Sequence, residues 1–469
     1  MIKYFILLFC LCLTACRVGE EYLPQNFIDG KNIKRTLQLS NTPKNIRSDW
    51  YEIFKDDVLN TLLKQILTDN LTLKQYKERL IQSRYNFEIQ SKQFLPFLDA
   101  NGKYQYNKSN NAKNITENIN AFKLGFDASW ELDVWGKGQY ISEQYLEMMK
   151  NAEYSLLNIK TVISAEAISN YINLREAQEK LRIAQKNLKL QKDILKTVAD
   201  KHSAGVADDL ALNQAEYTVE KTNATIPLLQ MQIETYKNSL AVLLGKTPDE
   251  LPISLDKYKK NIVASMFKYS VKDMYNLPLN VICNRPDIVA VEAQLKEQNA
   301  VVNEAIANLY PSISLGAVFG YVSLSGKRLF NTNNQIYGYT PAITQPIWHW
   351  KQLVNNVELQ KHIKEEYLLN YNETILVALS ELKNAIVSVE QIYNTATHKQ
   401  RSLAKMQNIF NLTLEKYHNG LVEFTDVALA EQNLLDAQND LIENNALILQ
   451  YLTAFYKAAG GGYHIDEQK

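Results

Sequence analysis

The sequence predicts a mainly α-helical protein that contains one structural unit twice and adds β-strands to each copy. Residues 139–204 and 347–419 are two long runs without a Gly or a Pro, which favours long helices. Similar segments recur at one constant spacing along the chain, which indicates a tandem duplication. The stretch "NAFKLGFDASWELDVW" (120–135) alternates between apolar and polar residues, which is typical of a strand with two different faces.

The N-terminus predicts export. "MIKYFILLFCLCLTAC" has a Lys at position 3 and an apolar run too short to span a bilayer, the pattern of a signal peptide covering residues 1–15. Its end, Leu-Thr-Ala-Cys16, resembles the lipobox of bacterial lipoproteins, in which the cysteine is acylated. An ordinary secretory signal with an incidental cysteine is the alternative. We expect a lipidated N-terminal linker over 16–50 that begins at Cys16.

Net charge and hydropathy argue against nucleic acid as a partner and against a transmembrane helix as an anchor. Lys and Arg together number 51, as do Asp and Glu, so the net charge is zero and nothing indicates general attraction to nucleic acid. No segment has eighteen consecutive apolar residues, so the sequence predicts no transmembrane helix.

The duplication sets the expected domains. Pro96 and Pro311 have the same separation as Gly205 and Gly420, and the residues around each pair are similar. This separation is called the repeat spacing below, and a constant value over several landmarks is hard to obtain by chance. The expected segments are a first repeat at 51–255, an inter-repeat equatorial segment at 256–283, a second repeat at 284–459 and a flexible C-terminal tail at 460–469.

Each repeat is expected to run from a short helix through two strands to a long helical hairpin. Fully helical, the two Gly- and Pro-free runs would be about 100 and 110 Å long. Leu181, Leu188 and Leu195 recur every seven residues, as in a coiled-coil seam. The hairpins are expected to turn at Gly205 and Gly420, and Pro227 is expected to interrupt the returning helix of the first one.

Four strands are expected, at about 97–108, 119–134, 312–324 and 335–346. A soluble sheet packed on helices is one interpretation, and a sheet that faces lipid is the other. The export signal and the length of the strands favour lipid. The even-numbered positions from Phe122 to Leu132 are then expected to face the membrane, and the odd-numbered positions from Lys123 to Glu131 are expected to face a lumen. Four tryptophans lie where strand gives way to helix and are predicted to form an interfacial girdle: Trp130, Trp135, Trp348 and Trp350.

A sheet in lipid must close on itself, because lipid offers no hydrogen bonds to a free edge. Four strands are too few to close. Two chains would supply eight strands and three chains would supply twelve, the latter with room for an aqueous lumen. Three copies of two helical hairpins would likewise close into a tube of twelve helices.

Motifs for catalysis are missing from the sequence. The six histidines form no metal-spaced pair, and there is no phosphate-binding loop, nucleophile elbow or zinc-like cysteine pairing. We therefore expect no enzyme activity, no catalytic residue, no cofactor and no metal site.

The chain resembles the outer-membrane efflux proteins, the TolC-like outer-membrane factors of tripartite pumps, in their lipoprotein branch. The resemblance rests on "WELDVWGKGQ" (130–139), "RPDIVAVEAQL" (285–295), "ANLYPSISL" (307–315) and "KYHNGLVEFTDVALAEQNLLDAQNDL" (416–441). It implies a homotrimer with a 12-stranded barrel in the outer membrane, continuous with a long periplasmic α-helical barrel. Such a trimer is a passive exit duct for drugs or other small molecules, and its partners are outer-membrane lipid, a periplasmic adaptor and an inner-membrane transporter.

The resemblance also implies a narrow end near the hairpin turns. Asp426 falls on the family position of a constriction aspartate, while Leu429 replaces a second one. Asp208, Asp209 and Glu423 lie near the same turns and are expected to add negative charge, which would attract cations. The alternative is that these acids only start helices, where the helix dipole favours them. The turns at Gly205 and Gly420 are the implied docking sites for the adaptor.

Two other functions stay open from the sequence. One is a lipid-anchored periplasmic coiled-coil scaffold without a pore, and the other is a duct for type I protein secretion. A scaffold would have no use for lipid-facing strands or an aromatic girdle.

Overall fold

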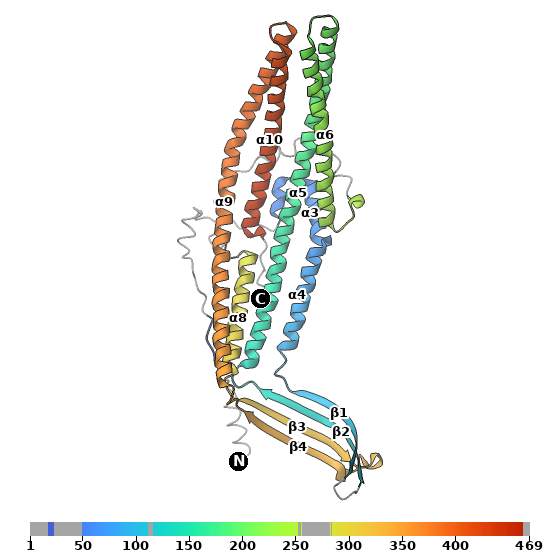
Figure 1. Cartoon of the computed structure of the whole chain (residues 1–469). Helices are drawn as coiled ribbons and strands as arrows, with labels where there is room; N and C mark the ends of the chain where they lie inside the picture. The colour runs from blue at the N-terminus through green and yellow to red at the C-terminus, as the bar shows by residue number, and fades with distance from the viewer. Residues whose placement is uncertain are drawn as a thin grey trace. The chain divides into compact units, whose positions relative to one another are not determined.

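The computed structural model describes residues 17–22, 49–110, 116–251, 255, 282 and 284–462. The predicted signal peptide, Cys16, most of the linker 16–50 and nearly all of the segment 256–283 lie outside the described residues. Figure 1 labels the α-helices, which are α3 (Asp57–Asp69), α4 (Leu71–Gln90), α5 (Lys137–Ser203), α6 (Asp209–Leu244), α8 (Pro286–Ala307), α9 (Trp350–His418) and α10 (Phe424–Ala458). It also labels the strands, which are β1 (Phe97–Asn110), β2 (Thr116–Leu132), β3 (Ser312–Ser323) and β4 (Gln335–Thr344). The short 3-10 helices are η1 (Trp50–Phe54), η2 (Pro248–Glu250), η6 (Gly326–Arg328), η7 (Thr332–Asn334) and η8 (Gly460–Gly462).

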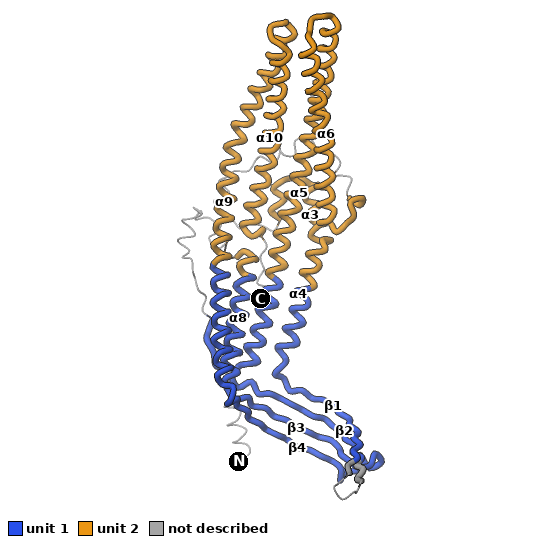
Figure 2. Tube along the Cα trace, viewed as in Figure 1, with its two compact units in different colours: residues 1–25, 79–153, 290–372 blue, residues 26–78, 154–289, 373–469 orange. Residues whose placement is uncertain are grey.

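The chain divides into two compact units, and each takes segments from both halves of the sequence (Figure 2). The first unit contains all four strands, with the adjoining parts of α4, α5, α8 and α9. The second contains α3, α6, α10 and the remaining parts of the long helices. The mainly helical fold with a small sheet is the fold class that the sequence predicts.

In the first unit the four strands form one antiparallel sheet in the order β1-β2-β3-β4. The apolar positions of each strand fall in register across the sheet. Phe126 of β2 lies opposite Ala100 of β1 and Phe319 of β3, and Phe319 lies opposite Tyr337 of β4. The apolar alternation seen in the sequence therefore forms one continuous face.

This apolar face is open to the surroundings of the chain. Side chains on it that keep about half or more of their surface exposed include Leu98, Phe126, Phe319, Tyr337, Tyr339 and Ile343. Gly125 and Gly320 lie opposite each other on the other face, where a Cβ on Gly320 would lie 2.5 Å from the backbone oxygen of Leu124. Only glycine allows β2 and β3 to approach so closely at this point.

Strand β2 gives way to α5 through a side-chain cap. Asp133 accepts hydrogen bonds from the backbone N–H groups of Gly138 (3.0 Å) and Gln139 (3.1 Å). These donors have no partner within the helix, so the carboxylate stabilises the first turn of α5. The same unit contains residues 17–22, where Tyr140 of α5 donates a hydrogen bond to the backbone oxygen of Val18 (2.6 Å).

The second unit begins at a buried aromatic cluster and a capped helix. Trp50 stacks on Tyr456 of α10 with ring centroids 4.8 Å apart. Asp56 accepts from the N–H of Val58 and so starts α3, and its other oxygen accepts from the hydroxyl of Tyr171 on α5 (2.6 Å). One face of α3 is fully buried, which ties this helix to the hairpins.

Helix α6 continues through Pro227 from Asp209 to Leu244. The expected interruption at Pro227 is therefore wrong. A proline removes one hydrogen bond and clashes with the preceding turn, an effect of about 3 kcal/mol. Buried residues on both sides, among them Val219 and Leu240, hold the two parts of the helix against the rest of the unit, and this packing outweighs the local effect.

The joint at the end of each hairpin is built twice. In the first repeat, Asn70 Nδ2 donates to the backbone oxygen of Leu243 at 2.8 Å. In the second, Arg285 Nη1 donates to the backbone oxygen of Ala458 at 2.9 Å. The two donors are one repeat spacing apart, and so are the two acceptors, so the duplication reproduces the contact with a different side chain.

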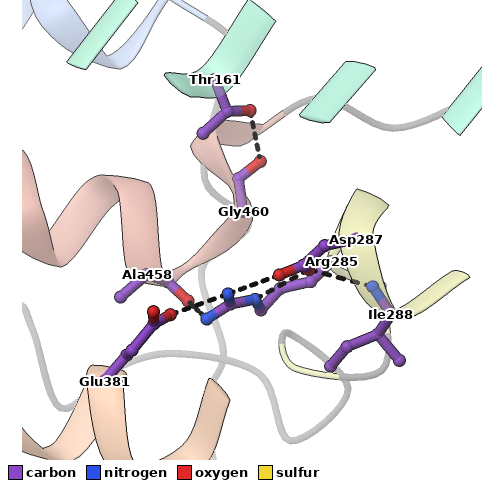
Figure 3. A network of polar contacts seen from close by, with 7 residues as sticks. All are labelled: Thr161, Arg285, Asp287, Ile288, Glu381, Ala458 and Gly460. Atoms are coloured by element: carbon purple, nitrogen blue, oxygen red, sulfur yellow. Dashed lines mark hydrogen bonds and ion pairs between the residues drawn. The ribbon is translucent and has the colours of Figure 1, made fainter. Parts of the chain in front are cut away.

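Arg285 carries the larger network, which Figure 3 shows. Its guanidinium forms ion pairs with Asp287 (2.7 Å) and Glu381 of α9 (2.8 Å) while its side chain is only 8% exposed. Burial lowers the pKa of Arg285, but the two carboxylates more than offset this effect and hold it above its ordinary value. The network joins the start of α8 to α9 and to the end of α10.

The predicted tail starts at residue 460, whereas Gly460–Gly462 are buried in η8. Gly461 has φ 64°, and a Cβ there would lie 2.7 Å from the side chain of Thr161 on α5. Glycine thus allows the end of α10 to pack closely on α5. Among the described helices, none combines the length and the apolar character needed to cross a membrane.

Candidate functional site: the hairpin turns and the tryptophan girdle

The two hairpin turns have the same backbone. Gly205 and Gly420 both have φ 73°, a left-handed conformation that ends α5 and α9. In each turn the residue after the glycine donates back to the helix, Val206 to Lys201 and Leu421 to Lys416, both at 2.9 Å. A Cβ on either glycine would meet no atom within 4 Å, so backbone conformation and not crowding requires glycine here.

A groove of about 460 Å³ lies between the two turns, within the second unit. Both turns line it, with Val206 and Asp208 from the first and Val422 and Glu423 from the second. Lys201 lies over the ring of Tyr417 at 4.1 Å from its centroid, a cation–π contact that joins α5 to α9 beside the groove. Val206 and Leu421 are about three-quarters exposed, so the turns present apolar side chains to the surroundings.

The four acids predicted near the turns are all exposed, but they lie in three different settings. Asp208 is the N-cap of α6 and accepts from the N–H of Ala211 at 2.9 Å. Glu423 is the N-cap residue of α10, yet its side chain makes no capping hydrogen bond with the described residues. Asp208 and Glu423 line the groove together, which Asp209 and Asp426 do not.

Asp209 and Asp426 lie in the first turns of their helices. Asp209 Oδ1 lies 2.8 Å from His202 Nε2, a contact that spans the first hairpin turn. Asp426 lies in the first turn of α10. One chain brings only Asp208 and Glu423 to a common groove, and a ring of Asp426 side chains would need further copies of the chain.

The turns rest on an apolar cluster that joins both hairpins. Its buried members come from α5, α6, α9 and α10 and are Ile194, Val198, Ala215, Phe410, Tyr417, Phe424, Val427, Ala430 and Leu434. Phe424 packs edge-on against Tyr417 at 5.7 Å between centroids. The cluster fixes the position of the two turns relative to each other within this unit.

The four tryptophans of the predicted girdle divide into two pairs. Trp130 and Trp135 donate their indole N–H groups to the backbone oxygens of Phe94 (2.9 Å) and Pro311 (2.7 Å). Trp348 is 96% exposed and Trp350 is 45% exposed. Trp135 and Trp348 line one groove of about 690 Å³ where the strands meet the helices. The first pair is anchored by its N–H groups, whereas the second pair exposes its rings to the surroundings of the chain.

Buried polar residues in the helical stripes are what sequence reasoning missed. Glu431 of α10 is 5% exposed and Gln191 of α5 is 4% exposed. The available signal was their spacing, because each continues an apolar stripe, Glu431 between Val427 and Leu434 and Gln191 one turn before Ile194. Periodicity alone does not show that such a position is buried, because burial also depends on which helix packs against it.

The family model for outer membrane efflux proteins matches residues 62–246 and 277–461. The two matches cover most of the chain and are offset by the repeat spacing of the duplication. The chain belongs to the outer membrane efflux protein family. It is an outer-membrane protein of an efflux system, and its family is one of transport proteins.

Relatives and solved structures agree with this membership. The chain is 26% identical to the cation efflux system protein CusC of Escherichia coli K12, over 97% of this chain and 99% of the relative. It is 26% identical to the pyoverdine export outer membrane protein OpmQ of Pseudomonas aeruginosa, over 98% and 96%. The fold matches the outer-membrane channel OprN at a TM-score of 0.85 and 24% identity, covering 95% of this chain and 99% of that one. The CmeC outer membrane channel of Campylobacter jejuni matches at 0.85 and 23%, over 97% and 96%.

Proposed function

We propose that three copies of this chain form a passive exit duct in the outer membrane for drugs or other small molecules delivered by an inner-membrane transporter. A periplasmic adaptor couples the two by docking at the hairpin turns. The observation that carries the proposal is the continuous apolar face of the four-stranded sheet, which lies in register and stays exposed on the single chain.

Strand length supports a position in the membrane. The strands have 14, 17, 12 and 10 residues, and a tilted strand needs about 9–11 to cross a bilayer. The opposite face of β1 and β2 carries Asp99, Asn101, Lys103, Lys123 and Asp127. Lipid on the apolar face and water on this face satisfy both sets of side chains.

The sheet edges support an oligomer. Among the described strands, β1 and β4 each pair on one side only, so each leaves a row of backbone N–H and C=O groups without strand partners. Unpaired backbone groups in lipid cost several kcal/mol each, so β1 of one copy should pair with β4 of the next. Three copies give twelve strands and an aqueous lumen, whereas two give eight and a lumen filled by side chains.

A lipid on Cys16 would enter close to the girdle. Residue 17 follows it directly, and Arg17 forms an ion pair with Glu143 of α5 at 2.6 Å. Val18 donates its N–H to the backbone oxygen of Trp135 at 3.4 Å, and Asn303 of α8 holds the backbone of Glu20 by two hydrogen bonds of 2.9 Å. These contacts keep the start of the mature chain beside Trp135, where an acyl chain has a short way into lipid.

The groove between the turns suits a docking adaptor. Its walls combine exposed apolar residues with two carboxylates, Asp208 and Glu423, and one cation, Lys201. The carboxylates outnumber the cation, so the groove favours a partner with apolar and basic side chains. Asp426 is proposed as the constriction residue, because three symmetry-related copies would bring three carboxylates together. Asp208 accepts from the N–H of Ala211, and Asp209 contacts the ring of His202. Both would contribute negative charge near the turns without moving toward the central axis of the trimer.

Purification from outer-membrane fractions tests the duct. We expect a trimer that resists SDS until heated and that conducts ions in planar bilayers. A chain that stays monomeric, or that leaves the membrane without detergent once Cys16 is replaced by Ala, contradicts the duct and favours the lipid-anchored scaffold. Deleting the gene and exposing cells to drugs, bile salts and metals then identifies the cargo class.

The constriction is tested by Asp426→Ala in the same bilayer assay. Loss of three carboxylates should raise basal conductance or reduce cation selectivity, because a ring of like charges attracts cations and narrows the path. Glu373→Ala, which removes an exposed acid on α9 far from the turns, serves as the control. Unchanged conductance and selectivity would remove Asp426 from the constriction.

A further inference from the structure

Helices α5 and α10 are joined by polar side chains, and one of these has an ionisable group in an apolar setting. These helices run antiparallel and are joined by Gln450 with Asn173 (2.8 Å) and by Asn187 with Gln438 (3.0 Å), pairs in which an amide donates to an amide oxygen. Nearer the turns, Gln191 of α5 and Glu431 of α10 occupy the next position of the same stripe. Both side chains are buried.

Two acceptor atoms at this position have no donor. Within the described part of the chain, Glu431 Oε1 and Gln191 Oε1 are buried without a hydrogen-bond partner. The amide of Gln191 donates a hydrogen bond to the carboxyl of Glu431, yet Glu431 Oε1 stays without a donor. An ionised carboxylate has only acceptors, whereas a protonated one adds an O–H donor, for which Gln191 Oε1 is an unpaired acceptor.

Among the described residues, the surroundings of Glu431 supply no compensating charge. Glu431 lies between Ala430 and Leu434 of the apolar cluster, and α9 contributes Leu403, Met406 and Phe410 to that cluster. The nearby charges contact other atoms, since Lys221 of α6 and Asp436 of α10 both bind Gln432. On α5 the neighbouring Lys192 and Asp193 are exposed, and Lys201 and Tyr417 face each other at the far end of the cluster.

Burial therefore raises the pKa of Glu431 to about 7, and the hydrogen bond with Gln191 opposes the shift. No charged side chain of the described residues contributes to this pKa.

We propose that Glu431 and Gln191 form a proton-binding site that sets how tightly the second hairpin packs on the first. With the proton bound, the pair is neutral, its oxygens gain a donor, and α10 stays packed on α5. Without it, a buried carboxylate favours local opening that admits water, which loosens the apolar cluster under the turns. The proposal concerns packing within one chain and does not depend on the proposed duct.

The sign of the effect follows from linkage. A carboxyl whose pKa is higher in the packed state than in the open state binds its proton more tightly when packed. The packed state is therefore favoured at low pH, and this contribution is lost as the pH rises through about 7.

Hydrogen exchange of the full-length protein in detergent tests the site. We expect peptides from 184–198 and 424–438, after correction for intrinsic exchange, to lose protection about tenfold between pH 6 and pH 8. Glu431→Gln, which keeps the shape and adds a donor, should hold protection constant over this range. Glu415→Gln makes the same change at an exposed position and should keep the wild-type profile.

A second variant guards against misfolding of the first. Gln191→Met places on α5 the residue found one repeat spacing later on α9, Met406. Removing the amide donor should move the midpoint of the pH-dependent loss of protection to higher pH, because the Gln191 hydrogen bond lowers the pKa of Glu431. A general loss of packing would instead reduce burial and move this midpoint to lower pH. A Glu431→Gln protein that keeps the wild-type midpoint overturns the proposal, and so does an unchanged midpoint in Gln191→Met.

Discussion

The two hairpins have the same backbone at their turns but different chemistry at equivalent positions. Gly205 and Gly420 have the same φ of 73°. At the same repeat spacing, however, Glu216 is exposed on the single chain while Glu431 is buried, and Asp208 caps its helix while Glu423 does not. Duplication has kept the geometry that a turn requires and changed the side chains that tune stability and charge.

The difference has a physical reason. A left-handed turn allows few residues, so both copies keep glycine. A buried position between helices tolerates a polar side chain if a partner is present, and only one of the two copies has such a partner, Gln191, where the other has Met406. The second repeat therefore carries the buried titratable group. Substitutions at equivalent positions of the two repeats test how far this contrast extends.

The largest effect is expected at the duplicated joint. Arg285→Ala should destabilise the protein by about 3 kcal/mol, because it leaves two carboxylates and a buried carbonyl oxygen without their donor; partial exposure of the carboxylates moderates the effect. Asn70→Ala should cost only about 1–2 kcal/mol, since it removes two neutral hydrogen bonds. Urea unfolding in detergent measures both, with exposed Arg401→Ala as the control. Equal losses at the two joints would contradict a stronger second joint.

The next effect concerns Glu297 of α8, whose counterpart in the first repeat is Gln82. Burial, and then the charge of Glu147, raises the pKa of Glu297 to about 7. Its stabilising contribution is present at low pH and is lost as the pH rises through about 7. Glu297→Gln should therefore stabilise the protein at pH 8 by about 2 kcal/mol and change little at pH 5.

Thermal unfolding at the two pH values gives the measurement. Glu292→Gln, a substitution of a carboxylate that is paired with Lys296 at 2.7 Å on the same helix, is the control and should not stabilise at pH 8. A gain of equal size at pH 5 and pH 8 would rule out titration as its cause.

A smaller effect is expected at the helix starts. Asp208→Ala removes the cap of α6 and should cost about 1 kcal/mol, whereas Glu423→Ala removes no capping hydrogen bond and should cost almost nothing. Glu423→Asp gives α10 the same N-cap side chain that Asp208 provides for α6, and it should stabilise α10 slightly. Hydrogen exchange of the first turn of each helix reports the local change. If Glu423→Ala matches Asp208→Ala, the difference between the two turns lies elsewhere.

The last comparison is in the girdle, where Trp135 and Trp350 lie one repeat spacing apart. Trp135→Phe removes the hydrogen bond to Pro311 and part of the stacking on Tyr310, for a loss of about 1 kcal/mol. Trp350→Phe changes a half-exposed ring and should cost less than half as much in detergent. Heat-induced unfolding of the two variants compares them directly, and a larger loss for Trp350 would assign it a contact inside the assembly.

Much of the architecture was predictable because its causes are local. Alternation over 120–135 predicts a two-faced strand, and the pairing of Phe126 with Phe319 follows once the strands form one sheet. The turn glycines and the constant repeat spacing predict the two hairpins. Asp208 as a helix start is also a local matter, since the carboxylate and its N–H partner belong to the same helical turn.

Long-range packing accounts for the rest. The heptad Leu181, Leu188 and Leu195 predicts a seam, yet the most buried stripe of α5 includes Asn187 and Gln191 and is set by where α10 lies. Likewise Pro227 lies inside a continuous helix because distant residues hold both halves in place.

The duplication, the hairpin turns, the four strands and the membership of an exported transport family could be read from the sequence alone, because each depends on neighbouring residues or on a spacing. Which of two equivalent glutamates is buried depends instead on tertiary packing. Glu216 and Glu431 occupy equivalent positions in the two repeats, and their different environments come from helices that lie far from them along the chain.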